Sequence, residues 1–301
     1  MRYFQIVADS GSYSRGAELL QISQPAVSRA VNLLEEELGR PLFNRNGHGV
    51  SLTDSGRILL ERSHQILRQV EQTVAEIRRG ETGPSGTVAI ALPPAAGFFI
   101  APALAQAVAN QYPGVSLRFV GGVNGDVHDW LARGAVDMAC LYDPAPQRGF
   151  ESRPLLREQV FLVRRPDASG AFAGEVGLDR LMAMPLILPG ASDPTRRLLD
   201  AWAIQHGGRL DPRLESDDQT MTHSLIAQGL AAGLSTRGAF ADDIARGALE
   251  AIATSPVIHW TLKIVTNQRA ARSELTDIVS KVMVDVIEDL RTSGVWETDP
   301  V

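Results

Sequence analysis

The sequence has little or nothing of several features that mark particular classes of protein. Its 301 residues include one cysteine, Cys140, which excludes an internal disulfide and a cysteine metal cluster. Because Cys140 stands in the apolar run 138–141, we expect a buried strand thiol rather than a nucleophile. The most apolar window, 88–109, is interrupted by prolines and a glycine and predicts no membrane span. The N-terminus lacks a basic segment followed by an apolar core, so we expect no signal peptide and a cytoplasmic protein.

The sequence also lacks the patterns of common enzyme sites. Neither a Gly-x-Ser-x-Gly elbow nor a Gly-x-x-x-x-Gly-Lys phosphate loop occurs. The acidic pair Asp217-Asp218 is more typical of a solvated loop or a helix cap than of a catalytic dyad. The histidines show no metal-ligand spacing to one another or to carboxylates; those considered are His64, His128, His206, His223 and His259. We therefore expect no enzyme, no metal site and no cofactor.

Positive charge is scarce and comes almost entirely from arginine. The chain has 29 Lys and Arg against 35 Asp and Glu, a net charge of −6, and its only lysines are Lys263 and Lys281. Residues 1–80 nevertheless carry a balance of +1, whereas the remainder carries −7. A surface that binds a polyanion must therefore be local, and the N-terminal segment has the appropriate sign.

One stretch, residues 23–39, contains signals for both ends of a helix. Ser23 is expected to cap its start, Pro25 suits the first turn, and Gly39 ends it. An apolar stripe follows the helical period through Val27, Val31, Leu34 and Leu38. The polar residues off this stripe can hydrogen-bond to base edges or phosphates; they are Gln24, Ser28, Arg29 and Asn32. Taken alone, the stretch fits an ordinary capped surface helix equally well.

The neighbouring segments favour a nucleic-acid role. A first short helix is predicted to begin almost at Met1 and to end at Gly11. A second follows, capped by Ser12 or Ser14, with Ala17, Leu19 and Leu20 facing inward. Two short helices, a turn and a third helix with a polar front form a helix-turn-helix. Residues 41–52 then predict a hairpin with a glycine-rich tip, a wing that places Arg45 and His48 against backbone phosphates or the minor groove.

A long helix is predicted from residue 54 to about residue 80, with its cap in 53–56. Positions spaced alternately by four and three residues form a weak coiled-coil seam, which consists of Leu59, Ser63, Ile66, Val70, Thr73 and Ile77. At ~1.5 Å per residue the helix is about 40 Å long, too long to bury this stripe against its short neighbours. The pattern indicates a dimerisation helix, or alternatively a stiff spacer packed on its own domain.

The segment from Phe4 to Gly56 resembles the winged helix-turn-helix of LysR-type transcriptional regulators. The residues that carry the resemblance stand in register over this stretch: Ser12-Tyr13-Ser14-Arg15, Ala17-Glu18, Ser23-Gln24-Pro25-Ala26-Val27-Ser28, Leu34-Glu35, Leu38-Gly39, Pro41-Leu42-Phe43, Arg45 and Leu52-Thr53-Asp54-Ser55-Gly56. The resemblance implies that the third helix enters the major groove, with Gln24, Pro25, Ser28 and Arg29 as base and phosphate contacts and Arg45 on the wing. The residue pattern itself adds Asn32 and His48 to this DNA-binding set.

The chain departs from the family at several DNA-facing positions. Ala30 and Asn32 stand where long polar or basic residues are common, and Asn46, His48 and Ser51 fill wing positions that are often threonine or basic. Relatives usually begin several residues earlier, which indicates a shortened first helix or a misassigned start. Fewer cations neutralise fewer phosphates, so we expect a shallower salt dependence and weaker non-specific affinity.

After a hinge at 81–86 the pattern changes to alternating strands and helices. Strands are predicted at 87–92, 115–120 and 136–141, with helices at 98–111 and 125–133, an order that implies a parallel sheet. A second lobe is predicted from strands at 160–163, 185–188 and 214–216 and helices at 194–206 and 224–230; a strand at 260–266 returns to the first lobe, and the last helix spans 273–291.

This order resembles the periplasmic-binding-protein-like effector domain of the same family. The predicted fold is therefore multidomain: a winged helix-turn-helix, a long linker helix and a two-lobed α/β domain. The predicted domains are 1–53 for DNA binding, 54–86 for the linker and hinge, and 87–301 for the effector, with lobe I at 87–161 and 267–301 and lobe II at 162–266. Leu92-Pro93-Pro94 and Leu141-Tyr142-Asp143-Pro144 look most like the subgroup of nitrogen-assimilation-control regulators.

The resemblance also implies an effector site in the cleft between the lobes. Its predicted contacts are Ala95, Ala96, Asn124, Ser192, Thr195 and Thr236. Many relatives have serine at the position of Ala95, so an anionic effector would rely on helix N-terminal amides, Asn124, Thr195 and Arg196. Alternatively, Arg196 and Arg197 form a solvated helix face, and the cleft binds nothing and serves only assembly.

These observations predict a sequence-specific DNA-binding transcriptional regulator whose effector domain senses a small molecule, which we expect to be a small organic anion. The expected partners are double-stranded operator DNA, the effector, a second copy of the chain through residues 54–80, further copies in a homotetramer, and RNA polymerase. The alternatives are a cytoplasmic small-molecule-binding protein of solute-binding fold without a DNA function, and an enzyme on the two-lobed scaffold.

Overall fold

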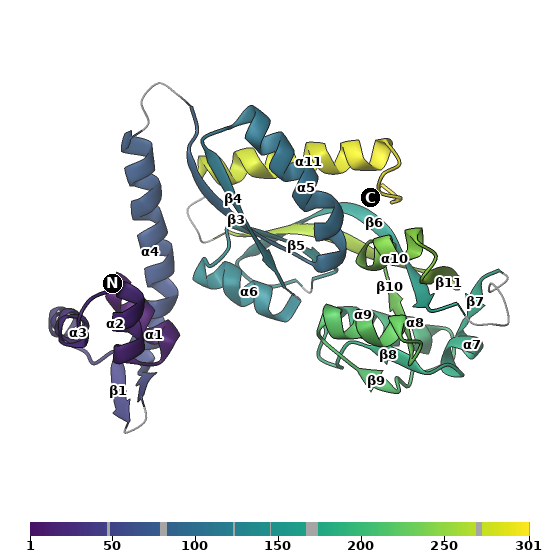
Figure 1. The fold of residues 1–301 in the computed structure, drawn as a ribbon, viewed down its shortest axis with the longest axis horizontal. Coiled ribbons are helices and arrows are strands. Elements are labelled where there is room, and N and C mark those ends of the chain that lie inside the picture. Colours follow the sequence, from purple (N-terminus) through teal and green to yellow (C-terminus); the bar gives the residue numbers. More distant parts are fainter. Residues whose placement is uncertain are drawn as a thin grey trace. The chain divides into compact units, whose positions relative to one another are not determined.

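The computed structural model describes residues 1–46, 49–78, 83–122, 124–144, 146–166, 174–268 and 273–300. They form two compact units, one consisting mainly of Met1–Gly86 and the other mainly of Thr87–Val301 (Figure 1). The finer domain and lobe boundaries drawn from the sequence stay predictions. No helix in the described ranges is long and apolar enough to cross a membrane.

Three helices begin the first unit: α1 (Arg2–Ser10), α2 (Tyr13–Leu20) and α3 (Gln24–Leu38). Ser12 caps α2 by accepting a hydrogen bond from the Arg15 backbone N–H, and Gly39, at φ 65°, ends α3. The predicted side-chain cap at Ser23 is wrong, because Ser23 makes no such hydrogen bond. One of the two N–H groups that a capping side chain could reach belongs to Pro25 and does not exist, and the other, of Ala26, donates to the Ser23 carbonyl at 3.0 Å.

A small apolar core joins these helices to the hairpin that follows. Its buried members are Phe4, Val7, Ala17, Val27, Val31, Leu42 and Phe43. Leu19 was expected inside but is 67% exposed. At about 100° per residue it lies roughly 200° around the helix from Ala17, which is buried. The apolar stripe of α3 is likewise buried only over its first half, since Leu38 is 47% exposed.

The predicted hairpin and long helix are both present. Strands β1 (Phe43–Asn46) and β2 (Gly49–Leu52) pair antiparallel, with Arg45 opposite Val50, whereas Gly47 and His48 lie outside the described residues. Helix α4 (Asp54–Arg78) is preceded by Thr53, whose hydroxyl accepts from the Gly56 N–H at 3.0 Å and donates to the Pro41 carbonyl at 2.7 Å. The helix is therefore tied to the start of the hairpin.

The seam predicted on α4 divides into a packed part and an exposed part. Leu59 packs against the core and Ser63 is buried. Farther along, Ile66 and Val70 are 37% and 52% exposed. The side chains of Thr73 and Ile77 lie outside the described residues. Within the first unit, α4 thus leaves apolar side chains uncovered on its C-terminal half.

The second unit is organised by a mixed sheet. In the described residues it has the order β4-β3-β5-β11-β6-β10-β8-β9, and β7 pairs with β11. The strands are β3 (Gly86–Leu92), β4 (Val115–Gly121), β5 (Met138–Tyr142), β6 (Phe150–Arg164), β7 (Val176–Gly177), β8 (Leu186–Leu188), β9 (Leu214–Glu215), β10 (Ala232–Ser235) and β11 (Glu250–Asn267). Strands β3 and β5 are parallel as predicted, whereas β11 runs antiparallel to β5.

The strands β6 and β11 are much longer than the sequence pattern indicated. They pair antiparallel from Glu250 opposite Arg164 to Asn267 opposite Phe150 and so extend through both halves of the sheet. The pairing shifts register between Ala253 and Ile258 and again between Leu262 and Lys263. Pro256 lies within the first irregularity, and Pro154 is the partner of Lys263 at the second. These prolines interrupt the alternating pattern and concealed the length of both strands.

The helices that cover the sheet are α5 (Pro94–Gln111), α6 (Asn124–Arg133), α7 (Leu178–Met182), α8 (Pro194–Gln205), α9 (Gln219–Ala227), α10 (Ala241–Ala245) and α11 (Glu274–Thr292), with a 3₁₀ turn η1 (Arg237–Phe240). Helices α5 and α11 lie side by side against the part of the sheet that contains β3 and β5 (Figure 1). Helix α5 starts four residues earlier than predicted, because Pro94 suits its first position. Helix α9 also starts earlier, since Asp218 caps it through the Met221 N–H at 2.8 Å.

A buried carboxylate on β6 anchors the C-terminal segment. Glu158 is 3% exposed and accepts hydrogen bonds from the Tyr142 hydroxyl and from the Trp296 indole N–H, the latter at 2.8 Å. Trp296 is buried as well and stacks on Phe99 with ring centroids 5.0 Å apart. Burial raises the pKa of Glu158 to about 7. The residues after α11 are thereby held against β6.

Gly56→Ala should destabilise the first unit although alanine favours helices. An added Cβ would lie 2.1 Å from the Leu42 carbonyl oxygen, and backbone cannot give way cheaply. We expect a loss of ~3 kcal/mol in the free energy of unfolding, measured by denaturant titration. Gly39→Ala is the control: its Cβ would meet nothing within 4 Å, so only the left-handed backbone should cost roughly 1 kcal/mol. Equal losses for the two variants would contradict the steric argument.

Glu158→Gln should remove a pH dependence of stability. Burial raises the pKa of the folded carboxyl to about 7, whereas the ordinary value is 4.5. The stabilisation is complete below pH 4.5, decreases as the pH rises to about 7 and is absent above. Urea unfolding at pH 5 and pH 8 should show this decrease in the wild type and in the exposed control Glu175→Gln, but not in Glu158→Gln.

Candidate nucleic-acid interface and effector loops

The first candidate site is the exposed side of α3. Val27 and Val31 are fully buried and so fix the rotation of the helix on its unit. The predicted DNA-contact residues point away from that core: Gln24, Pro25 and Arg29 are exposed, and Ser28 and Asn32 are half-buried. Five of the seven predicted contacts therefore lie on the outer surface of one helix. The N-terminal half of this surface carries Arg29 and no carboxylate.

The acidic end of α3 has a structural role that the sequence pattern did not predict. The Glu35 carboxylate accepts hydrogen bonds from the backbone N–H groups of Leu42 and Phe43 at 2.6 and 3.2 Å. It ties the end of α3 to the strand that opens the wing. Its charge is therefore engaged within the unit. The available signal for this role was that Glu35 belongs to the Leu34-Glu35 motif shared with the family.

The wing is attached to the helices at a second point. The Val50 N–H donates to the Gly11 carbonyl at 3.1 Å, which joins β2 to the turn between α1 and α2. Arg45 lies on β1 at the position opposite Val50. His48 lies outside the described residues. The wing is thus tied to α3 by the Glu35 carboxylate and to the turn between α1 and α2 by a main-chain hydrogen bond.

The residues predicted for the effector site lie in both halves of the second unit. Ala95 and Ala96 lie before the helix predicted at 98–111, but in the structure they belong to the first turn of α5, where both are buried. Asn124 begins α6, and Thr236 immediately precedes η1 and is fully buried. The first turn of α5 lies close to η1, because the Ala95 carbonyl is only 2.6 Å from where a Cβ of Gly238 would stand.

The remaining two predicted residues lie beside α8. Ser192 is exposed in the turn before the helix, and Thr195 is half-buried in its first turn. The Asp193 carboxylate already caps this helix and accepts hydrogen bonds from the Thr195 N–H at 2.7 Å and from its hydroxyl at 2.5 Å. A carboxylate at this helix end opposes a second anion there. The start of α8 is therefore a poorer anion site than its sequence indicated.

Arg196 neither faces solvent nor is available for an effector. Its guanidinium is buried and donates hydrogen bonds to Asp200 at 3.0 Å, to Glu215 at 2.9 Å and to the Pro189 carbonyl at 2.9 Å. It joins α8 to β9 instead, and only Arg197 of the pair is exposed. Both interpretations of Arg196 from the sequence are replaced by this structural one.

Cys140 is a core residue as the sequence predicted. It is fully buried, its sulfur lies 3.8 Å from that of Met283, and burial raises the pKa of its thiol to about 12. A thiol with such a pKa is not a nucleophile near neutral pH. Within the described ranges, no group of three or more His, Cys, Asp or Glu side chains is arranged to hold a metal ion.

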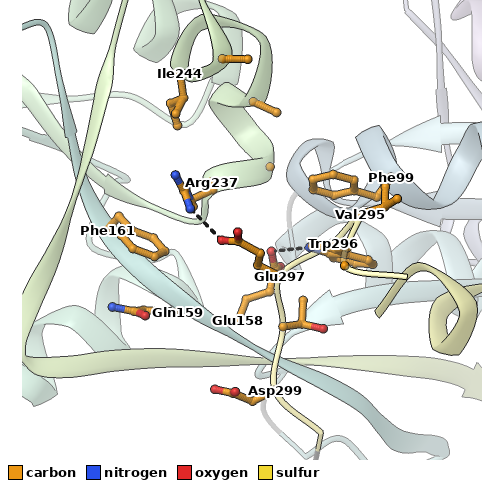
Figure 2. A pocket seen from close by; sticks show the side chains of 15 residues that line it. Phe99, Glu158, Gln159, Phe161, Arg237, Ile244, Val295, Trp296, Glu297 and Asp299 are labelled. Atoms are coloured by element: carbon orange, nitrogen blue, oxygen red, sulfur yellow. Dashed lines mark hydrogen bonds and ion pairs between the residues drawn. The ribbon is translucent and has the colours of Figure 1, made fainter. Parts of the chain in front are cut away.

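Sequence reasoning also missed the most unusual polar residue of the second unit. From Leu156 to Leu162, every second residue of β6 is buried, a series that includes Glu158 and Val160. A carboxylate at one position of an otherwise apolar period-two series was a signal for a special role. Glu158 and the C-terminal residues 294–299 line a cavity (Figure 2).

Comparison with known proteins agrees with this architecture. The family model described as LysR substrate binding domain matches residues 81–286, and that of the bacterial regulatory helix-turn-helix protein, lysR family, matches residues 1–57. The chain is 30% identical to the nitrogen assimilation regulatory protein Nac of Klebsiella aerogenes, covering 95% of this chain and 94% of that protein. It is 28% identical to the HTH-type transcriptional regulator BbuR of Bordetella bronchiseptica, covering 100% and 93%.

Solved structures show the same fold. The crystal structure of CbnR, a LysR family transcriptional regulator, has a TM-score of 0.73 at 18% identity and covers 95% of this chain and 97% of its own. A full-length OxyR variant from Pseudomonas aeruginosa has a TM-score of 0.68 at 21% identity and covers 95% of each chain. With both family models matched in order, the chain belongs to the LysR family of DNA-binding transcriptional regulators, with an N-terminal helix-turn-helix and a C-terminal substrate-binding domain of periplasmic-binding-protein-like fold.

Proposed function

We propose that this regulator recognises its operator through the exposed front of α3, and that the hairpin β1–β2 contacts the adjacent backbone. The observation that carries the proposal is the division of α3 into a buried apolar side and an outer polar side. We assign base and phosphate contacts to Gln24, Pro25, Ser28, Arg29 and Asn32, and wing contacts to Arg45 and His48. A helix fits the major groove, and a guanidinium such as that of Arg29 can bind guanine or phosphate through two hydrogen bonds.

A structure of CbnR with its target DNA supports this assignment at the level of the fold. It has a TM-score of 0.56 at 19% identity and covers 95% of this chain. A solute-binding protein without a DNA function is the less supported alternative, because residues 1–57 match the regulatory helix-turn-helix model. Because the LysR family consists of transcriptional regulators, we propose that the protein has no catalytic activity. We propose a cytoplasmic location, where operator DNA is accessible.

We further propose that α4 joins two copies of the chain through residues 54–80. Ile66, Val70 and Val74 recur every four residues and are 37%, 52% and 39% exposed. Three apolar side chains on one face of a long helix favour pairing with a second helix. We assign 1–53 to DNA binding, 54–86 to dimerisation and 87–301 to the effector. Two copies of α3 would read half-sites one or more helical turns apart. A homotetramer and contact with RNA polymerase complete the proposed assembly.

For the effector we propose a small organic anion between the lobes. The proposed contacts are Ala95, Ala96, Asn124, Ser192, Thr195 and Thr236. The start of α5 supports the proposal, because Pro93 leaves its first turn without a side-chain cap and the N-terminal amides of a helix favour anions. The capped start of α8 contributes less, since the Asp193 carboxylate occupies it.

Arg29→Ala should weaken operator binding by roughly tenfold or more, the effect of losing one good base or phosphate contact. A gel-shift titration measures this with DNA selected from a random duplex pool by the wild-type protein. The control is Arg153→Ala, an exposed arginine of β6 in the second unit. Unchanged affinity of Arg29→Ala would remove this residue from the interface.

Val70→Glu should weaken dimerisation by at least ~tenfold, because an unpaired carboxylate is costly to bury in an apolar seam. Sedimentation equilibrium measures the dimer dissociation constant directly. Leu19→Glu serves as the control, since this side chain on α2 is also exposed, at 67%, but lies off the seam. If Val70→Glu associates as tightly as the control, α4 acts as a spacer instead.

A further inference from the structure

A cavity of about 540 Å³ lies in the second unit between β6, η1, α10 and the C-terminal segment 294–299. It shares no residue with the proposed effector contacts. Its volume falls in the range of small-molecule sites. Figure 2 shows Phe99 on one side, Phe161 and Ile244 on the other, and Glu158 between them. The cavity therefore combines apolar walls with a carboxylate.

Glu158 is a buried carboxylate without a cationic partner in the described part of the chain. Its Oε2 accepts from the Tyr142 hydroxyl and its Oε1 from the Trp296 indole, and both donors are neutral. Each oxygen has a further lone pair to offer. An ionised carboxylate buried without a cation is costly, and desolvation is the main cause of its raised pKa. A cation placed in the cavity would relieve that cost.

The other charges that line the cavity also favour a cation. Three lining residues are acidic, Glu158, Glu297 and Asp299, against one arginine, Arg237. Glu297 forms an ion pair with Arg237 at 2.7 Å, and Asp299 lies 3.4 Å from His259. The carboxylates on the cavity outnumber its guanidinium, so an anion would be opposed there.

Arg237 indicates where a cation fits. Its guanidinium lies 5.4 Å from the centroid of the Phe161 ring and binds Glu297, so one cation already uses an aromatic face and a carboxylate of this cavity. The pair is 45% and 73% exposed, and exposed ion pairs are weak. An incoming ligand can therefore exchange with Arg237 at little cost.

We propose that this cavity binds a small organic amine, with its ammonium group between Glu158 and Glu297 and its apolar body against Phe99, Phe161 and Ile244. Bound there, the amine joins β6 to the C-terminal segment. The residues that line this site differ from the effector contacts proposed above.

Isothermal titration calorimetry of the full chain tests the site with three probes of matched shape: phenethylamine, 2-phenylethanol and phenylacetate. We expect phenethylamine to bind at least ~tenfold more tightly than either of the others, the effect of one charge-assisted hydrogen bond. The absence of binding by the amine, or equal binding of the alcohol or the acid, would overturn the proposal.

Variants assign the binding to this cavity. Glu158→Gln keeps the size of the side chain and should weaken phenethylamine binding by ~tenfold or more. Glu297→Gln should weaken it by roughly two- to fivefold, since this carboxylate is exposed. Ile244→Trp fills the cavity and should abolish binding, which keeps the test decisive if Glu158→Gln does not fold. Glu175→Gln should bind as the wild type does.

Wild-type affinity in both Glu158→Gln and Ile244→Trp would place the amine elsewhere and overturn the proposal. Operator binding in a gel shift, measured on the same variants, separates this result from the proposed DNA function.

Discussion

The antiparallel pairing of β6 with β11 is the constraint on which the second unit depends. The two strands stay paired from Glu250 opposite Arg164 to Asn267 opposite Phe150, with two shifts of register. On one side of the pair the sheet continues through β5, β3 and β4, and on the other through β10, β8 and β9. Both halves are thus extensions of one hydrogen-bonded ribbon. Any residue on the middle of β6, Glu158 above all, belongs to both halves at once.

In the first unit, the buried apolar residues of α3 determine which side of that helix is exposed. Val27 and Val31 hold α3 against Phe4 and Phe43, and the polar half of the helix is left outside. Glu35 fixes the far end of α3 by binding the backbone of Leu42 and Phe43. The exposed polar surface of α3 therefore owes its orientation to side chains on the opposite, buried side of the helix.

Much of the architecture could be predicted because the relevant signals are local. Gly39, Pro25 and Ser12 act on the few residues beside them, and the hairpin at 43–52 and the helix from Asp54 follow from short patterns. The predictions failed where neighbours in space intervene. Leu19 is apolar, as a core residue should be, but lies on the exposed side of α2. Arg196 is hydrogen-bonded to Glu215, which lies on another element. The long strands were concealed by Pro154 and Pro256, which a sheet accommodates only at its irregularities.

The sequence by itself determined that the N-terminal part carries a helix-turn-helix with a polar front and that the rest alternates strands and helices. Capping, turn formation and helical periodicity act over a few residues, so the local sequence predicts them. Only the tertiary structure decided that Glu158 and Trp296, 138 residues apart, share a hydrogen bond, and that Arg237 and Glu297 pair beside a cavity. Such contacts depend on how β6, η1 and the C-terminal segment fold back on one another, and no local pattern records that path.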